Sequence, residues 1–239
     1  MKKTLALLLT ALLVFVVGCE SELDGQTAAQ VSPPTPDEPE AAEEEEEDET
    51  VEVREIAFDS ETSKIEWLGA KVTGDHDGGF HEWEGTAHVD HENNLKKVEF
   101  TVDTTSIWSD NDRLTAHLKN EDFFEVETYP EATFVSRSIS EGVDMEGAEG
   151  THTVTGDMTI KETTQRITFP VTVAVDDDAM KITSNFTLMR FDFGVDFKGA
   201  ADDLIRDEVL LKLDFALPLE AAAVADTAEE EVAEESEEG

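Results

Sequence analysis

A period-two alternation of apolar and polar residues runs through the middle of this chain and limits the folds that it can adopt. In residues 97–103, the apolar side chains Val98, Phe100 and Val102 share one side of an extended strand. The same period recurs in residues 167–175 and 209–217. Because successive side chains of a strand point to opposite faces, this pattern predicts strands with one buried face.

Short clusters of turn-forming residues separate the alternating segments. They lie at residues 74–79, 92–94, 147–150 and 176–178. Further strands are expected near residues 51–58, 64–73, 80–90, 132–139, 151–160 and 180–188. About eight strands with one apolar face each predict an all-β fold, either a closed antiparallel barrel or a sandwich. A barrel of about eight strands is wide enough to hold one small ligand.

One segment, around residues 110–119, departs from the strand pattern. Leu114 and Leu118 lie four positions apart, which places them on the same face of a helix. Ser109 stands where an N-cap is expected, with Asp112 three residues later. The sequence therefore predicts one short helix between two groups of strands.

The N-terminus has the features of a secretory signal. Two lysines precede a run of apolar or small residues from Leu5 to Val17, which is too short to span a bilayer as a helix. The run ends in Val16-Val17-Gly18-Cys19, which resembles the bacterial lipobox. In such signals the cysteine thiol is diacylated, the peptide is cut before the cysteine, and the new N-terminus is acylated. Cys19 is also the chain's one cysteine. We therefore expect a signal peptide over residues 1–18 and a lipid anchor on Cys19, the alternative being a plain signal peptide with a chance cysteine.

Charge separates the remaining segments and excludes one class of partner. The chain has 58 acidic and 17 basic residues, a formal charge of −41, and such a field repels nucleic acid. Residues 19–50 combine prolines with a run of glutamates and are expected to form a disordered tether, which as a flexible coil spans roughly 30 Å. Residues 221–239 are expected to be a disordered acidic tail. Residues 51–220 remain as one domain, attached to the cell envelope and facing the periplasm or the exterior.

The central segment carries a specific combination of motifs. His117-Leu118-Lys119 is followed by Asp122-Phe123-Phe124 and then by Tyr129-Pro130. Further matching segments lie on both sides of this motif and in the same order along the chain: residues 65–74 before it, and residues 154–160 and 190–194 after it. The combination resembles the YceI-like family of lipocalin-like, polyisoprenoid-binding periplasmic proteins. The resemblance implies a lipocalin-like barrel whose ligand is an isoprenoid or another long-chain lipid.

The ligand site implied by this resemblance is the apolar interior of the barrel. The residues expected to line a tunnel there are Trp67, Phe100, Val102, Phe134, Phe169, Val171, Phe186, Leu213 and Phe215. Arg113 and His117, four apart on the short helix, are candidates for contacting a polar head group. The alternative for His117 is that it holds the helix to a neighbouring strand.

The sequence contains no motif that is specific for catalysis or metal binding. Four of the six histidines fall within residues 76–91, but their spacing suits no defined zinc motif. The chain has no nucleophile elbow and no phosphate-binding glycine loop. We therefore expect no catalytic residue, no metal and no cofactor other than a bound lipid. A structural or interaction lipoprotein with a filled barrel is the rival to a lipid-binding protein.

Overall fold

The computed structural model describes residues 21–34, 53–176 and 178–219. The predicted signal peptide over residues 1–18, the anchor at Cys19 and the tail over residues 221–239 lie outside these residues. Of the predicted tether over residues 19–50, only residues 21–34 are described.

The described residues form one antiparallel sheet of thirteen strands, so the all-β prediction is confirmed and the strand number is higher than eight. The strands are β1 (Gln30–Ser32), β2 (Arg54–Asp59), β3 (Lys64–Lys71), β4 (Gly74–Phe80), β5 (Trp83–Val89), β6 (Leu95–Asp103), β7 (Ile107–Ser109), β8 (Glu131–Glu141), β9 (His152–Ile160), β10 (Thr163–Val175), β11 (Ala179–Met189), β12 (Gly199–Ala200) and β13 (Asp203–Pro218). One α-helix, α1 (Asp112–Leu118), and two 3-10 helices, η1 (Thr104–Ser106) and η2 (Arg190–Phe193), complete the fold.

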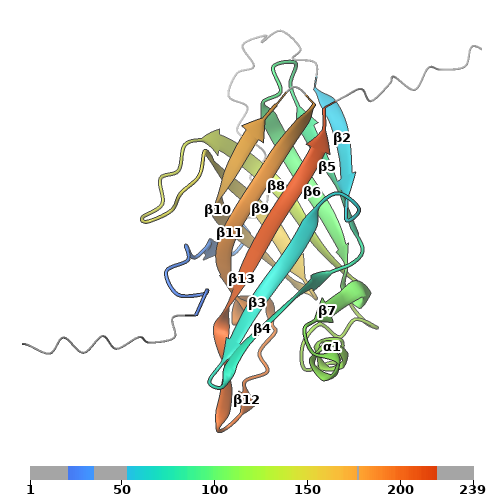
Figure 1. Ribbon diagram of the computed structural model, residues 1–239, viewed down its shortest axis with the longest axis vertical. Helices are drawn as coiled ribbons and strands as arrows, with labels where there is room; N and C mark the ends of the chain where they lie inside the picture. The colour runs from blue at the N-terminus through green and yellow to red at the C-terminus, as the bar shows by residue number, and fades with distance from the viewer. Residues whose placement is uncertain (1–20, 35–52, 177, 220–239) are drawn as a thin grey trace, which may run out of the picture.

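The sheet curls on itself around an apolar interior. Its strand order is β2-β5-β6-β8-β9-β10-β11-β13-β3-β4-β7, and Figure 1 shows α1 and β12 together at one end of the curl. The alternating residues of β6 and β13, such as Phe100 and Phe215, point inward and are buried. The period of two therefore decides which face of each strand becomes the core.

The short helix lies where the sequence predicts it, although its cap differs. Asn111 is the N-cap, because its side-chain oxygen accepts hydrogen bonds from the backbone N–H groups of Arg113 and Leu114. Ser109 instead ends β7, and its backbone N–H donates to the hydroxyl of Thr115. The hydroxyl thus ties the helix to the preceding strand.

The predicted turn over residues 74–79 is wrong, since this glycine-rich segment is strand β4. The reason is steric. A Cβ atom on Gly78 would lie 2.2 Å from the carbonyl oxygen of Trp108 and 2.3 Å from the ring of Trp67. Glycine is used here because two tryptophans and a backbone approach closely, and not because the chain turns.

The predicted disordered tether over residues 19–50 is wrong for residues 21–34, which the structure places against the outside of the barrel. Residues 21–32, here called the strap, begin beside β3 and end as β1, which pairs with β10. The β10–β11 ladder extends only from Thr172–Thr183 to Val175–Met180. Beyond it, the strap bonds to both strands, through Ala28 next to Thr187 on β11 and Gln30 opposite Thr168 on β10. The strap is therefore part of the barrel wall.

Candidate functional site

A cavity of about 460 Å³ occupies one half of the barrel interior. Side chains from β3, β6, β11 and β13 form its walls, and α1 with the residues after it covers one side. The apolar residues that contribute most of this lining are Ile65, Trp67, Phe80, Phe100, Val102, Leu114, Leu118, Phe123, Met158, Phe169, Phe186, Leu188, Phe193, Ile205, Val209, Leu211 and Leu213. This volume is within the range of sites that bury small molecules.

The other half of the barrel is filled by aromatic rings. Phe58, Trp83 and Phe215, here called the aromatic plug, pack with ring centroids 5.0–5.7 Å apart. Phe100 touches the plug at 5.6 Å from Phe215 and faces the cavity with its other side. The cavity is therefore blind at the plug.

The cavity opens at the opposite end of the barrel, here called the open end. Lys71 at the end of β3, Ala200 in β12 and Asp203 at the start of β13 belong to its lining, and Ala200 is exposed. Figure 1 shows this end as the one that carries β12 and α1. A ligand would enter here.

Six of the nine residues predicted to line a tunnel do line this cavity. They are Trp67, Phe100, Val102, Phe169, Phe186 and Leu213. The prediction for Phe134, Val171 and Phe215 needs correction, because all three are buried in the closed part of the core. Phe134 lies between Phe100 and Phe169, with ring centroids at 5.3 and 5.6 Å. Strand parity identifies inward residues but does not show how far along the barrel the empty space extends. That any of these residues contacts a ligand stays a prediction.

The lining residues that sequence reasoning missed come mostly from outside the alternating strands. Phe123 follows α1, and Phe193 and Val195 lie in and after η2. No alternation of apolar and polar residues in the sequence distinguishes such positions. Met158, Leu188 and Ile205 are on strands and share the inward parity of their neighbours, so the alternation could have found them.

Trp67 places an unpaired hydrogen-bond donor in the apolar wall. Its indole Nε1 is buried and has no hydrogen-bond partner among the described residues. The ring packs closely against Gly78, where a Cβ atom would lie 2.3 Å from it. A buried N–H without a partner costs free energy, so the cavity wall contains one unpaired donor that is shielded from the cavity itself.

The charged residues at the open end form ion pairs. Lys71 Nζ lies 2.7 Å from Asp203 Oδ2, and Thr73 donates to the other carboxylate oxygen through its backbone N–H and its hydroxyl. The hydrogen bond from Lys71 holds the pKa of Asp203 below its usual value. His76, also in the lining, lies 2.9 Å from Asp110. The charges at the rim are therefore largely matched by local partners.

Of the two candidate head-group residues, only His117 lines the cavity. Its Nε2 lies 2.8 Å from Asp122 Oδ2, and its ring packs edge-on against Phe123 and Phe197 at 5.0 Å each. These contacts hold α1 to the segments that follow it and to the loop after η2. Arg113 is exposed and lies outside the lining, and its contact with a head group stays a prediction.

A buried arginine fixes the wall near the open end. Arg190 is 7% exposed, and its guanidinium donates to the backbone oxygens of Val195, Ile205 and Arg206. Burial lowers the pKa of Arg190, and the nearby Asp207 opposes this shift. The three hydrogen bonds join η2 and the following loop to β13, which keeps the cavity wall in place.

The histidines of residues 76–91 are dispersed. His76 pairs with Asp110, His81 stacks on Trp108 at 5.7 Å, and His88 Nδ1 lies 3.8 Å from Glu55. Within residues 21–34, 53–176 and 178–219, no three His, Cys, Asp or Glu side chains gather in a way that would hold a metal ion. In the same part of the chain, no helix has the length and apolarity needed to cross a bilayer.

Comparison with solved structures shows the same fold in two bacterial proteins. BcnA of Burkholderia cenocepacia superposes with a TM-score of 0.58 at 24% identity, covering 66% of this chain and 98% of that one. A polyisoprenoid binding domain from Saccharophagus degradans, implicated in plant cell wall breakdown, superposes with a TM-score of 0.53 at 12% identity, covering 70% and 99%. At these identities the likeness shows the fold alone.

Sequence comparison gives the family. A UPF0312 protein of Pseudomonas putida strain W619 is 30% identical over 115 residues, 46% of this chain and 57% of that protein. Protein YceI of Escherichia coli strain UMN026 is 33% identical over 93 residues, 38% of this chain and 45% of that protein. The chain thus spans about half the length of these curated relatives. Residues 57–217, more than half of the chain, match the YceI-like domain. This protein belongs to the YceI-like domain family.

Proposed function

We propose that this protein binds a lipid with a long apolar chain, of the isoprenoid kind, inside its barrel. The observation that carries the proposal is the cavity of about 460 Å³, apolar along its walls, blind at the aromatic plug and open at the other end. This shape suits a chain inserted lengthwise. A structural neighbour from Saccharophagus degradans is itself described as a polyisoprenoid binding domain.

The energetics favour binding by burial. Removing about 500 Å² of apolar ligand surface from water contributes about 12 kcal/mol before ordering costs are subtracted. The walls are mostly apolar and offer few directional bonds to a ligand. We therefore expect selection by chain length and shape.

We further propose that the protein is a lipoprotein of the bacterial cell envelope, anchored through acylated Cys19. The support is the Val16-Val17-Gly18-Cys19 sequence after an apolar run. Two acyl chains hold a protein stably on a membrane, whereas one gives only marginal binding. Carriage or sequestration of the bound lipid would then take place at the membrane.

Two measurements test these proposals separately. Mass spectrometry of organic extracts from the purified domain, residues 21–219, should find a stoichiometric long-chain lipid. An extract without lipid, together with no uptake of added polyprenol, would favour the rival, a structural or interaction lipoprotein without a ligand. The mass of the N-terminal peptide from the full chain expressed in a bacterium should show acylated Cys19, and Cys19→Ser should lose both the acyl mass and membrane fractionation.

A further inference from the structure

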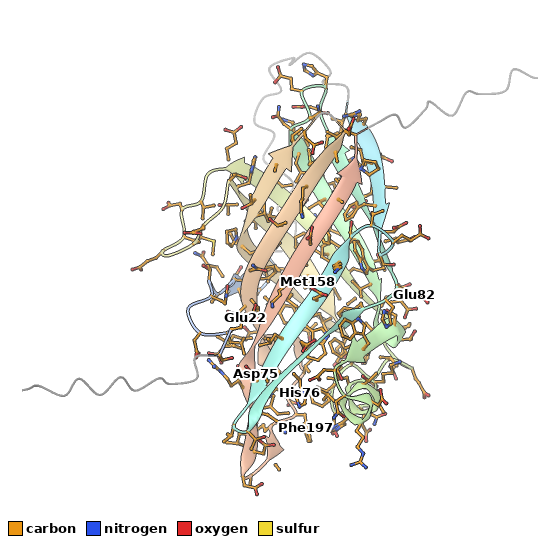
Figure 2. The ribbon with its side chains drawn as sticks, in the orientation of Figure 1. Glu22, Asp75, His76, Glu82, Met158 and Phe197 are labelled. Carbon is orange, nitrogen blue, oxygen red and sulfur yellow. The ribbon has the colours of Figure 1, made fainter. Side chains whose placement is uncertain are left out.

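The strap brings the start of the mature chain to the open end of the barrel. Leu23 is 4% exposed and packs on Leu68, Ala70 and Leu210 on the outer face of the sheet. Ser21 Oγ donates to Asp75 Oδ2 at 3.0 Å. Asp75 precedes His76, which lines the cavity, and Figure 2 shows these two residues near the end of the barrel where Phe197 lies.

Ion pairs hold this part of the strap against β13. Arg206 Nη1 lies 3.0 Å from Asp24, and Lys212 pairs with Glu22. The hydrogen bond from Arg206 lowers the pKa of Asp24, so the pair is charged at neutral pH. With Leu23 buried between these two pairs, the chain is fixed at Ser21.

The distance from this fixed point to Cys19 is short. Two residue steps separate Cys19 from Ser21, and an extended chain covers at most about 7 Å in two steps. A lipid attached to Cys19 therefore enters a bilayer close to Ser21 and Asp75. The stand-off of roughly 30 Å expected from a free coil is not possible.

The open end also carries exposed apolar side chains. Five large apolar residues stand out as exposed in the described part of the chain, and three of them lie at this end: Val72 in the β3–β4 turn, Phe191 in η2 and Leu204 at the start of β13. Val72 is 72% exposed and Leu204 50%, and the backbone N–H of Val72 donates to the carbonyl of Leu204 at 3.1 Å. The β3–β4 turn and the start of β13 are thereby joined into one apolar edge.

We propose that the open end is a membrane-docking surface: Val72, Leu204 and Phe191 rest on a zwitterionic bilayer while Cys19 anchors the chain beside them. Three independent features coincide here, namely the cavity opening, the exposed apolar edge and the point from which the anchor must extend. The bilayer is zwitterionic, because Asp75 and Asp202 are at the same end and the chain as a whole, with a formal charge of −41, repels anionic head groups. A mouth that faces the bilayer lets an apolar chain enter the barrel without crossing water. This inference rests on the proposed anchoring at Cys19.

Hydrogen exchange on vesicles tests the docking. The chain from residue 19 is made without lipid and coupled through Cys19, its one cysteine, to a maleimide phospholipid in phosphatidylcholine vesicles. Amide exchange in residues 72–74 and 199–204 should slow at least threefold relative to the uncoupled chain, while residues 91–94 at the plug end should not change. The double variant Val72→Glu/Leu204→Glu should lose this protection.

The control is a pair of exposed valines at the opposite end. Val53→Glu/Val175→Glu replaces side chains that are each 48% exposed and adds the same charge, so it should keep the protection. Coupled protein without slowed exchange at the two turns, or with slowing at residues 91–94, overturns the docking proposal alone. An unacylated Cys19 in the native chain overturns the anchoring and the docking with it, and neither result depends on whether lipid is extracted from the barrel.

Discussion

Trp67 is the residue where the apolar wall of the cavity has a polar atom without a partner. Replacing Trp67 by Phe removes the buried Nε1 donor and keeps an aromatic ring against Gly78. An unpaired buried donor costs about 1–3 kcal/mol, which offsets the smaller ring, so the free energy of unfolding of the delipidated protein should change by less than about 1 kcal/mol. Because Nε1 is shielded from the cavity, affinity for a long-chain alcohol and affinity for an alkane of equal length should change by the same factor.

Trp83→Phe is the matched control for that prediction. Trp83 Nε1 is also buried without a partner, but the ring belongs to the aromatic plug and not to the cavity lining. Urea denaturation and a fluorescent-probe displacement assay measure both variants. If Trp67→Phe weakens the binding of the alcohol but not that of the alkane, the indole N–H does reach the ligand.

Asp157 joins three neighbouring strands on the outer face of the barrel. Its carboxylate, on β9, accepts from Arg137 Nε on β8 at 2.7 Å and from Arg166 Nε on β10 at 2.8 Å. The hydrogen bond from Arg166, followed by that from Arg137, lowers its pKa. The pKa of Asp157 is lower in the folded state than in the unfolded state, so its ionised carboxylate stabilises the fold. This stabilisation is fully present above the unfolded-state pKa of about 3.9 and is lost as the pH falls through the folded-state pKa.

Asp157→Asn should therefore destabilise the protein by about 1–3 kcal/mol at pH 7, since it weakens hydrogen bonds to charged groups. The difference in the free energy of unfolding between the variant and the parent protein should stay constant down to about pH 5 and disappear below pH 4. Asp214→Asn serves as a control, because the pair with Lys181 has more than half of each side chain exposed and should contribute less than about 1 kcal/mol. A gap that does not narrow in acid would show that Asp157 acts through shape and not through charge.

At the scale of elements, the alternation predicted most strands and the cavity-facing side of each, but it failed at β4 and at the strap. Residues 74–80 have three glycines and no alternation, and they are a strand because they pair with β3 on one side and with β7 on the other. The strap lacks a period as well, and it is ordered because Leu23 covers Leu68 and Leu210 and because β10 and β11 separate beside it. The structures of β4 and of the strap both depend on contacts with segments distant in the sequence. Such contacts cannot be predicted from the local amino-acid composition.

The hairpin of β3 and β4 allows a test of the close packing at Gly78. Gly78→Ala would place a methyl group 2.2 Å from the backbone oxygen of Trp108, which cannot rotate away, so a loss of at least about 2 kcal/mol in the free energy of unfolding is expected. Gly69→Ala on β3 meets only the ring of Trp67 at 3.9 Å, an ordinary contact, and should be neutral or slightly stabilising. Thermal denaturation compares the two, and equal losses would mean that the hairpin rejects any side chain.

For the molecule as a whole, the sequence predicted the barrel and an apolar interior, but it could not predict how that interior divides. Inward residues have the same composition in the plug half and the cavity half, as Phe215 and Phe186 illustrate. The division arises where rings from several strands meet, around Phe58, Trp83 and Phe100. Three-dimensional contacts between residues far apart in the sequence therefore decide where a ligand fits.

This division leads to opposite expectations for two inward residues of the same barrel. Leu213 lines the cavity, so the larger side chain in Leu213→Trp can occupy ligand space; the delipidated protein should keep its stability within about 1 kcal/mol while co-purified lipid falls severalfold. Val171 is 3% exposed in the closed part of the core, so Val171→Trp should overpack and cost about 1–3 kcal/mol or more. Urea denaturation and lipid extraction on both variants test the pair. Equal destabilisation with unchanged lipid would mean that the space beside Leu213 does not admit a chain, because a cavity that accepts a lipid must also accept an indole.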